Sequence, residues 1–401
     1  MFQSIKNIYH YLQALLSAIY FNFPSKNLTV IGVTGTDGKT TTVNMIYHIL
    51  KSNGQKVSMI SSVNAQIGSK KIETGFHVTT PSPFQVQKLL RQSVISGDRY
   101  FVMEATSHGL DQNRLAFVNF IIAVKTNITE EHLDYHKTWE RLAMAKLKLF
   151  KNVQYSVLNS DDKAYSFLKD KVSGTIITYS QKNKADISLQ NFPVKLKILG
   201  DFNISNALAA ASVANILKIP KSKIISSLAS FEGVAGRMEK VDLGQKFTVI
   251  IDFAHTPNSL KNALSALRSQ VNPKSKVIAV FGAAGKRDKS KRQKMGVCAA
   301  ELADISIITA EDPRSEKVED ISSQIAAGFR KSDKRENKDY YQIAQRREAI
   351  NFAISKARDG DIVGLFGKGH EKSMAYNGKE LTWSEVEVAK QAIKRRLNDK
   401  K

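Results

Sequence analysis

The stretch Gly32-Val-Thr-Gly-Thr-Asp-Gly-Lys-Thr-Thr-Thr42 decides the fold of this chain. It follows the apolar run 28–33 and precedes apolar residues with helical spacing, so the sequence predicts a strand, a glycine-rich loop and a helix in that order. In such a loop the glycines let backbone N–H groups converge on phosphate oxygens, and the helix N-terminus adds partial positive charge. The segment therefore predicts a binding site for a triphosphate, which we take to be ATP.

The glycine spacing differs from the strict Walker pattern, which requires a glycine at the place of Val33. Here Gly35 and Gly38 form a tighter variant that keeps the sequence Gly-Lys-Thr. Lys39 supplies a full positive charge for the phosphates, and the Thr40 hydroxyl can bind Mg²⁺. The expected ATP-binding residues of the loop are Gly35, Thr36, Gly38, Lys39, Thr40 and Thr41.

The chain has 401 residues, a length that is enough for two or three domains. Of these residues 42% are hydrophobic and 24% are charged, which is the composition of an ordinary globular protein. The single cysteine, Cys298, excludes intramolecular disulfides and Cys-rich zinc sites, and it suits a reducing cytoplasm. The net charge of +23 predicts attraction to phosphate-bearing partners. The two basic clusters, 286–294 and 394–401, lack the interleaved aromatic residues of a base-stacking surface, so nucleic-acid binding is not favoured.

The N-terminal segment, residues 1–27, is apolar and rich in aromatic residues. Polar residues interrupt it, including Lys6 and His10, and it has no small-residue cleavage site, so neither a membrane span nor a signal peptide is predicted. Two interpretations stay open. The segment is either a helix packed on the body of the protein or an amphipathic helix that lies in a membrane interface.

Alternating strand and helix patterns indicate an α/β chain with two doubly wound regions. We expect a central P-loop-type ATPase domain with a mostly parallel sheet over residues 28–236, followed by a Rossmann-like C-terminal α/β domain over 237–401. Chemistry in such domains lies beyond the carboxyl ends of the strands. The expected strands after the first are 57–60, 100–103, 121–124, 155–158, 247–251, 277–281, 305–309 and 362–366.

Polar residues at two of these strand ends are candidates for chemistry, Glu104 after the strand 100–103 and Asn127 after the strand 121–124. Glu104 follows the strand 100–103 and can hold a magnesium ion beside the phosphate loop. The segment 105–114 is too polar for a core and is expected to be a loop that lines the substrate site. His132 is a metal ligand, a general base or a surface histidine, and Lys146 stands at the edge of an apolar helical stripe.

Nine motifs, in register from the phosphate loop almost to the C-terminus, give the chain its resemblance to a known family. The chain resembles the Mur ligases, and most of all the MurE type, the UDP-N-acetylmuramoyl-tripeptide synthetases that add the third residue to the peptide of cell-wall precursors. The motifs are Gly35-Thr-Asp-Gly-Lys-Thr-Thr41, Thr79-Thr-Pro81, Ser107-His-Gly-Leu110, Asn127-Ile-Thr-Glu-Glu-His-Leu-Asp-Tyr-His136, Ala145-Lys146 with Leu149-Phe150, Gly236-Arg-Met-Glu239, Ala254-His-Thr-Pro257, Asp312-Pro-Arg314 and Gly367-Lys-Gly-His-Glu371.

The resemblance implies a reaction in which ATP phosphorylates a carboxylate of the acceptor peptide and an amine attacks the acyl phosphate. It implies that Thr40 and Glu104 hold a first Mg²⁺, that His132 holds a second, and that Lys146 is a carbamylated metal ligand. Asn203 and Asn206 resemble residues that contact adenine. Arg237 and Asp252 resemble C-terminal-domain residues that reach the nucleotide when the domains close.

The resemblance also implies two groups of substrate residues. Those for the muramoyl-peptide nucleotide are Thr79, Thr80, Thr106, Gln112 and Arg114. Those for the amino acid, by similarity to enzymes that add meso-diaminopimelate, are Arg287, Glu311, Asp312, Arg314, Gly367 and Glu371. Arg314 can grip the distal carboxylate of diaminopimelate with two hydrogen bonds. The family sequence Asp-Asn-Pro-Arg reads Glu-Asp-Pro-Arg here, and an additional Lys286 precedes Arg287.

A typical MurE protein has an N-terminal domain that grips uridine diphosphate, and we expect this chain to lack it, because the phosphate loop begins at Gly32. One hypothesis is an acceptor on a lipid carrier, with the N-terminal segment and the basic surface at the membrane. Other readings are a folylpolyglutamate synthase, a cyanophycin-type ligase, a MurT-like amidating subunit, or a nucleotide-dependent binding protein without catalysis. The MurT-like reading is disfavoured because that family carries a cysteine cluster.

Overall fold

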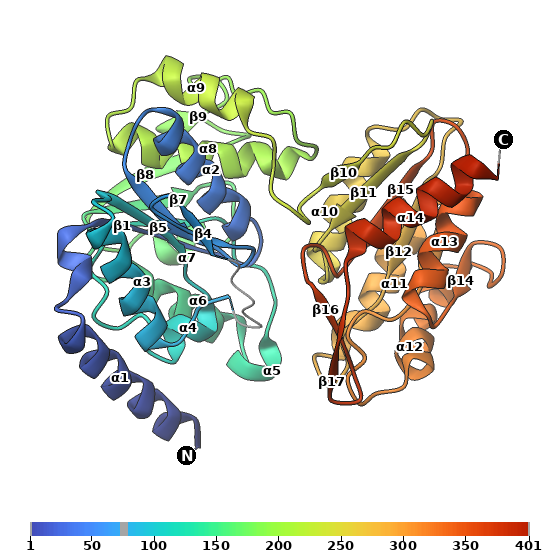
Figure 1. Ribbon diagram of the computed structural model, residues 1–401, viewed down its shortest axis with the longest axis horizontal. Helices are drawn as coiled ribbons and strands as arrows, with labels where there is room; N and C mark the ends of the chain where they lie inside the picture. The colour runs from blue at the N-terminus through green and yellow to red at the C-terminus, as the bar shows by residue number, and fades with distance from the viewer. Residues whose placement is uncertain (1, 73–78, 400–401) are drawn as a thin grey trace. The chain divides into compact units, whose positions relative to one another are not determined.

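Figure 1 shows the computed structural model of the chain, which describes residues 2–72 and 79–399. The chain divides into two compact units, and each is described by itself. The first unit comprises the chain up to Lys197 together with Phe202–Glu232. The second comprises Ile198–Asp201 and the chain from Gly233 onward. The predicted domain boundary at Gly236 falls just inside the second unit and stays a prediction.

The first unit is built on one large sheet, which has nine strands within the described residues, in the order β4-β3-β2-β5-β1-β6-β7-β8-β9. The two pairs β2–β3 and β3–β4 are antiparallel, and the other neighbours run parallel. The strands are β1 (Thr29–Thr34), β2 (Val57–Ile60), β3 (Ala65–Ile67), β4 (Lys70–Ile72), β5 (Tyr100–Glu104), β6 (Phe120–Lys125), β7 (Tyr155–Asn159), β8 (Thr175–Ser180) and β9 (Ile187–Ser188).

The centre of this sheet explains where the site lies. The strand β1 pairs with β5 on one side and β6 on the other, and its apolar sequence is buried almost throughout, as a strand covered on both faces requires. Its carboxyl end delivers the phosphate loop between the ends of β5 and β6. The helical segments of this unit are α1 (Phe2–Tyr20), η1 (Pro24–Asn27), α2 (Lys39–Ser52), α3 (Pro83–Ile95), α4 (Ser107–Asp111), α5 (Leu133–His136), α6 (Trp139–Leu147), η2 (Lys148–Phe150), α7 (Tyr165–Leu168), α8 (Asp201–Ile216) and α9 (Lys221–Ser230).

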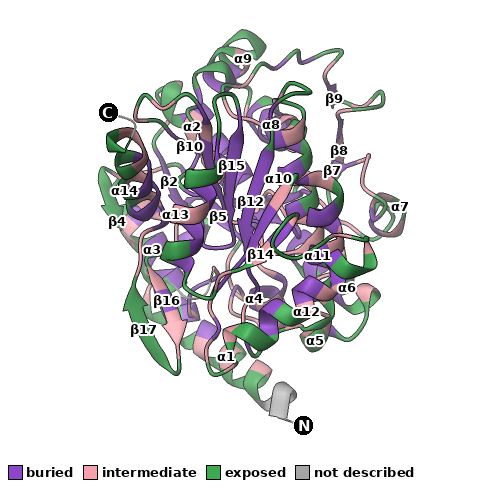
Figure 2. Ribbon diagram, turned by 90° about the vertical axis from the view of Figure 1, so that its right-hand side faces the viewer, coloured by how far each residue is buried: buried purple, intermediate pink, exposed green. Residues whose placement is uncertain are grey.

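The second unit has its own sheet, with six strands among the described residues, in the order β10-β11-β15-β12-β13-β14. Only the pair β10–β11 is antiparallel. Helices α13 and α14 bury Ile350, Ile354 and Ile393 against one face of this sheet, and Figure 2 shows β12 and β15 as buried strands. The elements are β10 (Glu239–Val241), β11 (Thr248–Asp252), α10 (Pro257–Arg268), β12 (Val277–Phe281), α11 (Ser290–Leu302), β13 (Ile305–Ile308), α12 (Val318–Lys331), β14 (Tyr340–Gln342), α13 (Arg346–Lys356), β15 (Ile362–Phe366), β16 (Ser373–Tyr376), β17 (Lys379–Thr382) and α14 (Glu385–Asn398).

The structure confirms the predicted α/β class with two mostly parallel sheets, and each predicted strand is present within one residue at either end. One local prediction was wrong. Residues 107–111, expected to lie in a loop, form the short helix α4. The Thr106 side chain accepts a hydrogen bond from the Gly109 N–H at 3.1 Å, so it caps a helix that the polar composition concealed.

The N-terminal helix α1 presents two different faces. Ala14, Ser17 and Ala18 are buried, and the helix packs against α3. The opposite stripe is apolar and exposed, with spacing of about one turn: Ile8, Leu12, Leu16 and Tyr20. Within the residues that the structure describes, no helix combines the length and the apolar character needed to cross a membrane.

Candidate active site

The phosphate loop, residues 35–38, turns between β1 and α2 through two glycines with positive φ. Gly35 has φ +151° and Gly38 has φ +84°. Lys39 opens α2, and its Nζ donates to the carbonyl oxygens of Gly35 at 2.8 Å and Thr36 at 2.7 Å. The lysine cation is therefore held directly over the loop, where the phosphate oxygens of a nucleotide would bind.

The segment that follows β6, residues 126–129, holds this loop in place. The Thr36 N–H donates to the Asn127 carbonyl at 2.8 Å, and the Asp37 N–H donates to the Asn127 side-chain oxygen at 2.9 Å. The Thr126 hydroxyl donates to the Asp37 carbonyl at 2.6 Å, and Thr129 exchanges hydrogen bonds with the Thr36 hydroxyl. A Cβ added at Gly35 would lie 1.8 Å from the Thr126 hydroxyl oxygen, so only glycine fits there.

The two expected adenine contacts, Asn203 and Asn206, lie on α8 and are buried. The Asn206 amide donates to the Asn203 side-chain oxygen at 3.1 Å, and the Thr42 hydroxyl donates to Asn206 at 3.4 Å. A Cβ at Gly38 would lie 2.2 Å from the Asn206 side-chain oxygen. Asn206 therefore packs against the phosphate loop itself.

Gly38→Ala is expected to weaken ATP binding at least about tenfold, because the new methyl group collides with Asn206 in addition to straining a left-handed backbone by about 1–2 kcal/mol. The matched control is Gly54→Ala at the other end of α2. Gly54 has φ +73° and nothing within 4 Å of the added Cβ, so it carries the strain without the collision. Titration of each variant with a fluorescent ATP analogue measures the affinity. Equal ATP affinities of the two variants would contradict a role for the Gly38–Asn206 contact.

Lys146, on α6, reaches the phosphate loop from a buried position. Its Nζ lies 3.1 Å from Glu131 Oε1 and donates to the Thr36 hydroxyl at 3.4 Å, and 1% of the side chain is exposed. Burial lowers the pKa of Lys146 to about 8, although Glu131 opposes the shift. Burial raises the pKa of Glu131, but Lys146, Lys39 and His132 outweigh it and lower that pKa to about 2. Near neutral pH a fraction of the buried Lys146 is therefore a neutral amine, whereas Glu131 beside it stays ionised.

His132 is the N-cap residue just before α5 and has a left-handed backbone, and its Nε2 lies 3.7 Å from Glu131 Oε2. It belongs to an aromatic cluster in which the His108 ring contacts the rings of His132, Tyr135 and His136. Burial, and then the neighbouring His132, lower the pKa of His108 to about 4. Burial lowers the pKa of His136 to about 4 as well. Both imidazoles are therefore neutral near pH 7.

Glu104 ends β5 beside Val33 of β1 and is 1% exposed. The Ser62 N–H donates to Glu104 Oε1 at 2.7 Å, and the Ser62 hydroxyl donates to Oε2 at 3.0 Å. The same hydroxyl lies 3.2 Å from that of Thr79, which links the carboxylate to the expected substrate residues. The β1–β5 register thus places a fixed carboxylate at the edge of the sheet from which the phosphate loop starts.

The expected residues for the muramoyl peptide form one connected group. The hydroxyls of Thr80 and Thr106 are 2.8 Å apart, and the Arg114 guanidinium donates to the Thr80 carbonyl at 3.1 Å and to Gln112 at 2.5 Å. The Gln112 amide in turn reaches the Tyr135 hydroxyl at 3.5 Å. This chain of contacts joins the substrate group to the histidine cluster.

The donor set suits Mg²⁺ that arrives with a nucleotide. Residues 2–72 and 79–399 contain no cluster of three or more His, Cys, Asp or Glu side chains that could hold a metal ion unaided. Thr40 is buried at the first turn of α2, and Glu104 offers one oriented carboxylate. Because Mg²⁺ retains water and takes phosphate oxygens as ligands beside one or two protein groups, a hydroxyl and a carboxylate here fit such an ion.

In the second unit, Arg237 and Asp252 lie at the carboxyl end of β11. Asp252 accepts from the Met238 N–H and the Ala254 N–H, both at 2.8 Å, and so fixes the turn that carries Arg237. The Arg237 guanidinium stands 4.3 Å from the centre of the Phe253 ring. A Cβ at Gly236 would lie 2.2 Å from the His370 backbone nitrogen, so the motifs 236–239 and 367–371 are packed together.

The expected amino-acid residues also form a group within the second unit. Lys368, 1% exposed, bridges Asp312 at 2.8 Å and Glu371 at 2.5 Å. Glu311 lies against Gly367, burial raises its pKa, and its Oε2 has no hydrogen-bond partner in the described part of the chain. The Arg314 backbone is left-handed and is fixed by the β16–β17 hairpin: its N–H donates to the Ala375 carbonyl at 2.9 Å. Arg287 lies in the same unit, in the loop after β12.

Three residues that belong to these groups were missed by the sequence analysis: Ser62, Glu131 and Lys368. Glu131 stood inside a recognised motif, but the motif alone does not show which of its side chains face the loop, whereas Asn127 was expected from its place after the strand 121–124. Ser62 follows β2 and Lys368 follows β15, so the strand-end rule that found Glu104 would have found both.

Two models of known protein families match most of this chain. Residues 33–214 match the Mur ligase middle domain, and residues 236–369 match the Mur ligase, glutamate ligase domain. Together the two matched regions contain the site residues described above, apart from Glu371.

Known proteins are similar over nearly the whole chain. The UDP-N-acetylmuramoyl-L-alanyl-D-glutamate--2,6-diaminopimelate ligase of Caldanaerobacter subterraneus subsp. tengcongensis is 38% identical over 399 residues, which cover 95% of this chain and 81% of that protein. The UDP-N-acetylmuramyl-tripeptide synthetase of a Roseiflexus species is 37% identical over 415 residues, with the same coverage of 95% and 81%.

Solved structures are also similar to this chain over nearly its whole length. The structure of a UDP-N-acetylmuramoyl-L-alanyl-D-glutamate--2,6-diaminopimelate ligase has a TM-score of 0.62 at 31% identity, covering 92% of this chain and 79% of that one. The MurF ligase of Thermotoga maritima in complex with ADP has a TM-score of 0.70 at 17% identity, covering 97% and 85%, and shows similarity of fold alone.

Proposed function

This chain belongs to the Mur ligase family, and on that premise we propose that it is an ATP-dependent, ADP-forming ligase that adds meso-diaminopimelate to a UDP-linked muramoyl-dipeptide in the synthesis of peptidoglycan precursors. The observation that carries the proposal is the convergence of Lys39 and Lys146 on one phosphate loop, beside the carboxylates of Glu131 and Glu104. Two of the proteins named above, the one from Caldanaerobacter and the solved structure at 31% identity, are UDP-N-acetylmuramoyl-L-alanyl-D-glutamate--2,6-diaminopimelate ligases by name.

The chemistry requires a carboxylate to approach a triphosphate, so repulsion between anions is the main obstacle. One oxygen of the acceptor carboxylate attacks the γ-phosphorus while the bond to the ADP oxygen breaks. The amine then attacks the acyl carbon, releases a proton, and displaces phosphate that carries the former carboxylate oxygen. Lys39 and the loop N–H groups neutralise the phosphates in the first step. Mg²⁺, when bound at Thr40 and Glu104, supplies further positive charge for the γ-phosphate.

The carbamylation of Lys146 and a second metal position at His132 are part of this proposal. Only a neutral amine reacts with CO₂, and a pKa of about 8 leaves roughly a fifth to a quarter of Lys146 neutral near pH 7.5. The carbamate would be an anion beside Glu131, so the pair would attract a cation. His132, next to Glu131, would complete the set of ligands.

The pocket for the amino acid is proposed in the second unit. Diaminopimelate carries two ammonium and two carboxylate groups, and the group around Lys368 offers matching charges of both signs. The buried Glu311 oxygen without a described partner can accept from an ammonium group, and Arg314 can pair with the distal carboxylate. Lysine lacks that carboxylate, which gives a physical basis for selection.

The proposal is tested by amino-acid-dependent phosphate release with ATP, Mg²⁺ and UDP-N-acetylmuramoyl-L-alanyl-D-glutamate. We expect release that requires all components and is faster with diaminopimelate than with lysine. Faster phosphate release with lysine than with diaminopimelate would contradict the assignment of the amino acid. Phosphate release at the same rate without the acceptor would contradict the proposed ligase activity.

We propose in addition that α1 contacts an anionic membrane surface. The stripe of Ile8, Leu12, Leu16 and Tyr20 leaves 61%, 52%, 67% and 76% of these residues exposed. Residues 1–36 contain Lys6 and Lys26 but no Asp or Glu, and the whole chain carries a charge of +23. An apolar stripe in an acid-free, basic segment is typical of a helix that lies in a lipid interface.

Co-sedimentation with vesicles tests this contact. We expect the chain to bind vesicles that contain phosphatidylglycerol, and the double variant Leu12→Gln, Leu16→Gln to bind at least about tenfold more weakly, because burial of each leucine stabilises by about 1.5–3 kcal/mol. Ile95→Gln is the control, since Ile95 is 71% exposed at the end of α3, outside the stripe. Equal sedimentation of the wild type and the double variant would remove the membrane contact.

A further inference from the structure

A buried ion pair lies behind the segment that holds the phosphate loop. Lys125 ends β6, and its Nζ lies 2.7 Å from Asp162 Oδ2 and donates to the Asn159 carbonyl at 3.3 Å. The exposed fractions of the two side chains are 0% and 7%. Neither residue has a role in the ligation described above, yet a buried pair is costly to desolvate and is weak support for stability by itself.

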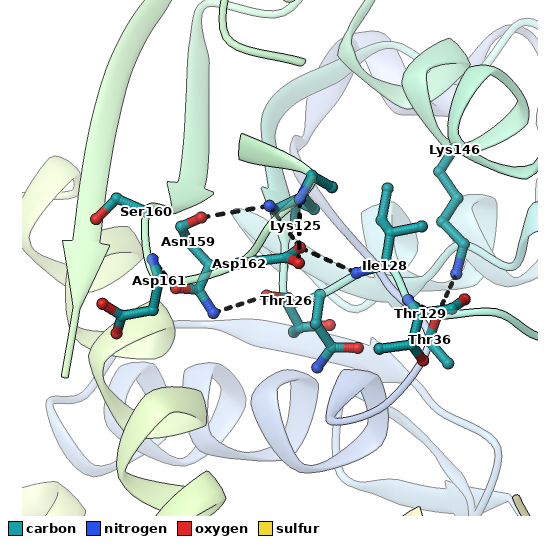
Figure 3. A network of polar contacts seen from close by, with 12 residues as sticks. Thr36, Lys125, Thr126, Ile128, Thr129, Lys146, Asn159, Ser160, Asp161 and Asp162 are labelled. Atoms are coloured by element: carbon teal, nitrogen blue, oxygen red, sulfur yellow. Dashed lines mark hydrogen bonds and ion pairs between the residues drawn. The ribbon is translucent and has the colours of Figure 1, made fainter. Parts of the chain in front are cut away.

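The Asp162 carboxylate connects this pair to the segment 126–129. The oxygen that meets Lys125 also accepts from the Ile128 N–H at 3.0 Å, and the other oxygen accepts from the Ala164 N–H at 3.3 Å. Beside it, the Asn159 amide donates to the Thr126 carbonyl at 3.0 Å. Figure 3 shows the carboxylate of Asp162 between Lys125 and Ile128.

Segment 126–129 thus has contacts on two sides. Its Ile128 N–H and Thr126 carbonyl are hydrogen-bonded to Asp162 and Asn159. Its residues Asn127 and Thr129 are hydrogen-bonded to Asp37 and Thr36 of the phosphate loop. Ile128, whose N–H is held by Asp162, stands between Asn127 and Thr129. A shift of the Ile128 N–H would therefore move both contacts that set the loop.

We infer that the Lys125–Asp162 pair positions the phosphate loop for ATP, and that Asp162 is a positioning residue whose carboxylate sets nucleotide affinity through Ile128. The inference rests on the proposed use of ATP. Neither Lys125 nor Asp162 is proposed to contact the nucleotide itself. The charge of Asp162 matters because an amide in its place would leave the buried Lys125 cation without a counter-charge.

Asp162→Asn in the full chain tests the inference, with thermal unfolding as a check of the fold. We expect the dissociation constant for ATP with Mg²⁺, measured by direct titration, to rise about tenfold or more, while the KM values for acceptor and amino acid stay within about twofold. Asp161→Asn is the matched control. Asp161 is adjacent, but it accepts from Ser180 and Gln181 near β8 instead of from segment 126–129, so its ATP affinity should not change.

Lys125→Met is the second variant, because Asp162 would keep both of its backbone N–H donors and the fold is retained more easily. We expect a smaller rise, about threefold, in the dissociation constant for ATP. A folded Asp162→Asn or Lys125→Met protein with wild-type ATP affinity would overturn the inference, and so would an equal loss of affinity for all three substrates. If the wild type binds no ATP, the proposed function fails first, and the two failures are thereby distinguished.

Discussion

Lys39→Met is expected to lower kcat of the ligation by about a hundred- to a thousandfold, because the variant loses the full charge that faces the developing phosphoryl oxygens. The Lys39 ammonium sits on the carbonyls of Gly35 and Thr36, so it occupies the loop before any nucleotide arrives. Methionine has similar length but no charge. The measurement is steady-state phosphate release with saturating acceptor and amino acid, together with the ATP dissociation constant.

Lys51→Met is the control for this change. Lys51 lies in the last turn of the same helix and is exposed, so its removal alters net charge and helix composition equally without touching the loop. We expect kcat of the control within about twofold of the wild type. A Lys39→Met protein that keeps more than about a tenth of wild-type kcat would show that the loop cation is not used in the transition state.

Lys146→Gln is expected to lower kcat by about a hundredfold or more, because the proposed carbamate would be lost along with its share of the charge around the phosphates. Glutamine leaves Glu131 buried without its 3.1 Å partner, so the fold is checked by thermal unfolding. Lys148→Gln is the control. Lys148 follows α6, is 38% exposed, and pairs with Asp111 instead of the phosphate loop.

Carbamylation adds a dependence on CO₂ that a plain lysine would lack. Wild-type activity is expected to fall in CO₂-depleted buffer and to recover with bicarbonate, whereas residual activity of Lys146→Gln should not respond. At a fixed concentration of dissolved CO₂, the recovery should be faster at about pH 8.5 than at about pH 7, because the neutral amine increases as pH rises through a pKa of about 8. Wild-type activity that is indifferent to CO₂ at every pH would contradict the carbamate.

The local parts of this site were predictable from the sequence. The strand β1, the phosphate loop and the start of α2 follow from apolar periodicity and glycine spacing, which act over a few residues. Glu104 followed from its place at a strand end. These features depend on backbone geometry that neighbouring residues determine.

The contacts that unite the site join residues far apart in the sequence and could not be derived from periodicity. Lys146 was expected at the edge of an apolar stripe, but it is buried because Glu131, fifteen residues earlier, compensates its charge. The Gly38 backbone and Asn206 meet although α8 lies in another part of the chain. Only the tertiary structure decides such pairings. The two readings of α1 were not exclusive, because one face packs on α3 and the other is exposed.

The transfer of oxygen from acceptor to phosphate tests the central claim, ligation through an acyl phosphate, most directly. The acceptor is labelled with ¹⁸O in the reacting carboxylate, and phosphate is analysed by mass spectrometry after turnover with ATP, Mg²⁺ and diaminopimelate. We expect one labelled oxygen in each phosphate formed from fully labelled acceptor, because the carboxylate oxygen that attacks phosphorus leaves with it. Unlabelled phosphate would mean that water attacks ATP, and it would contradict the proposed reaction.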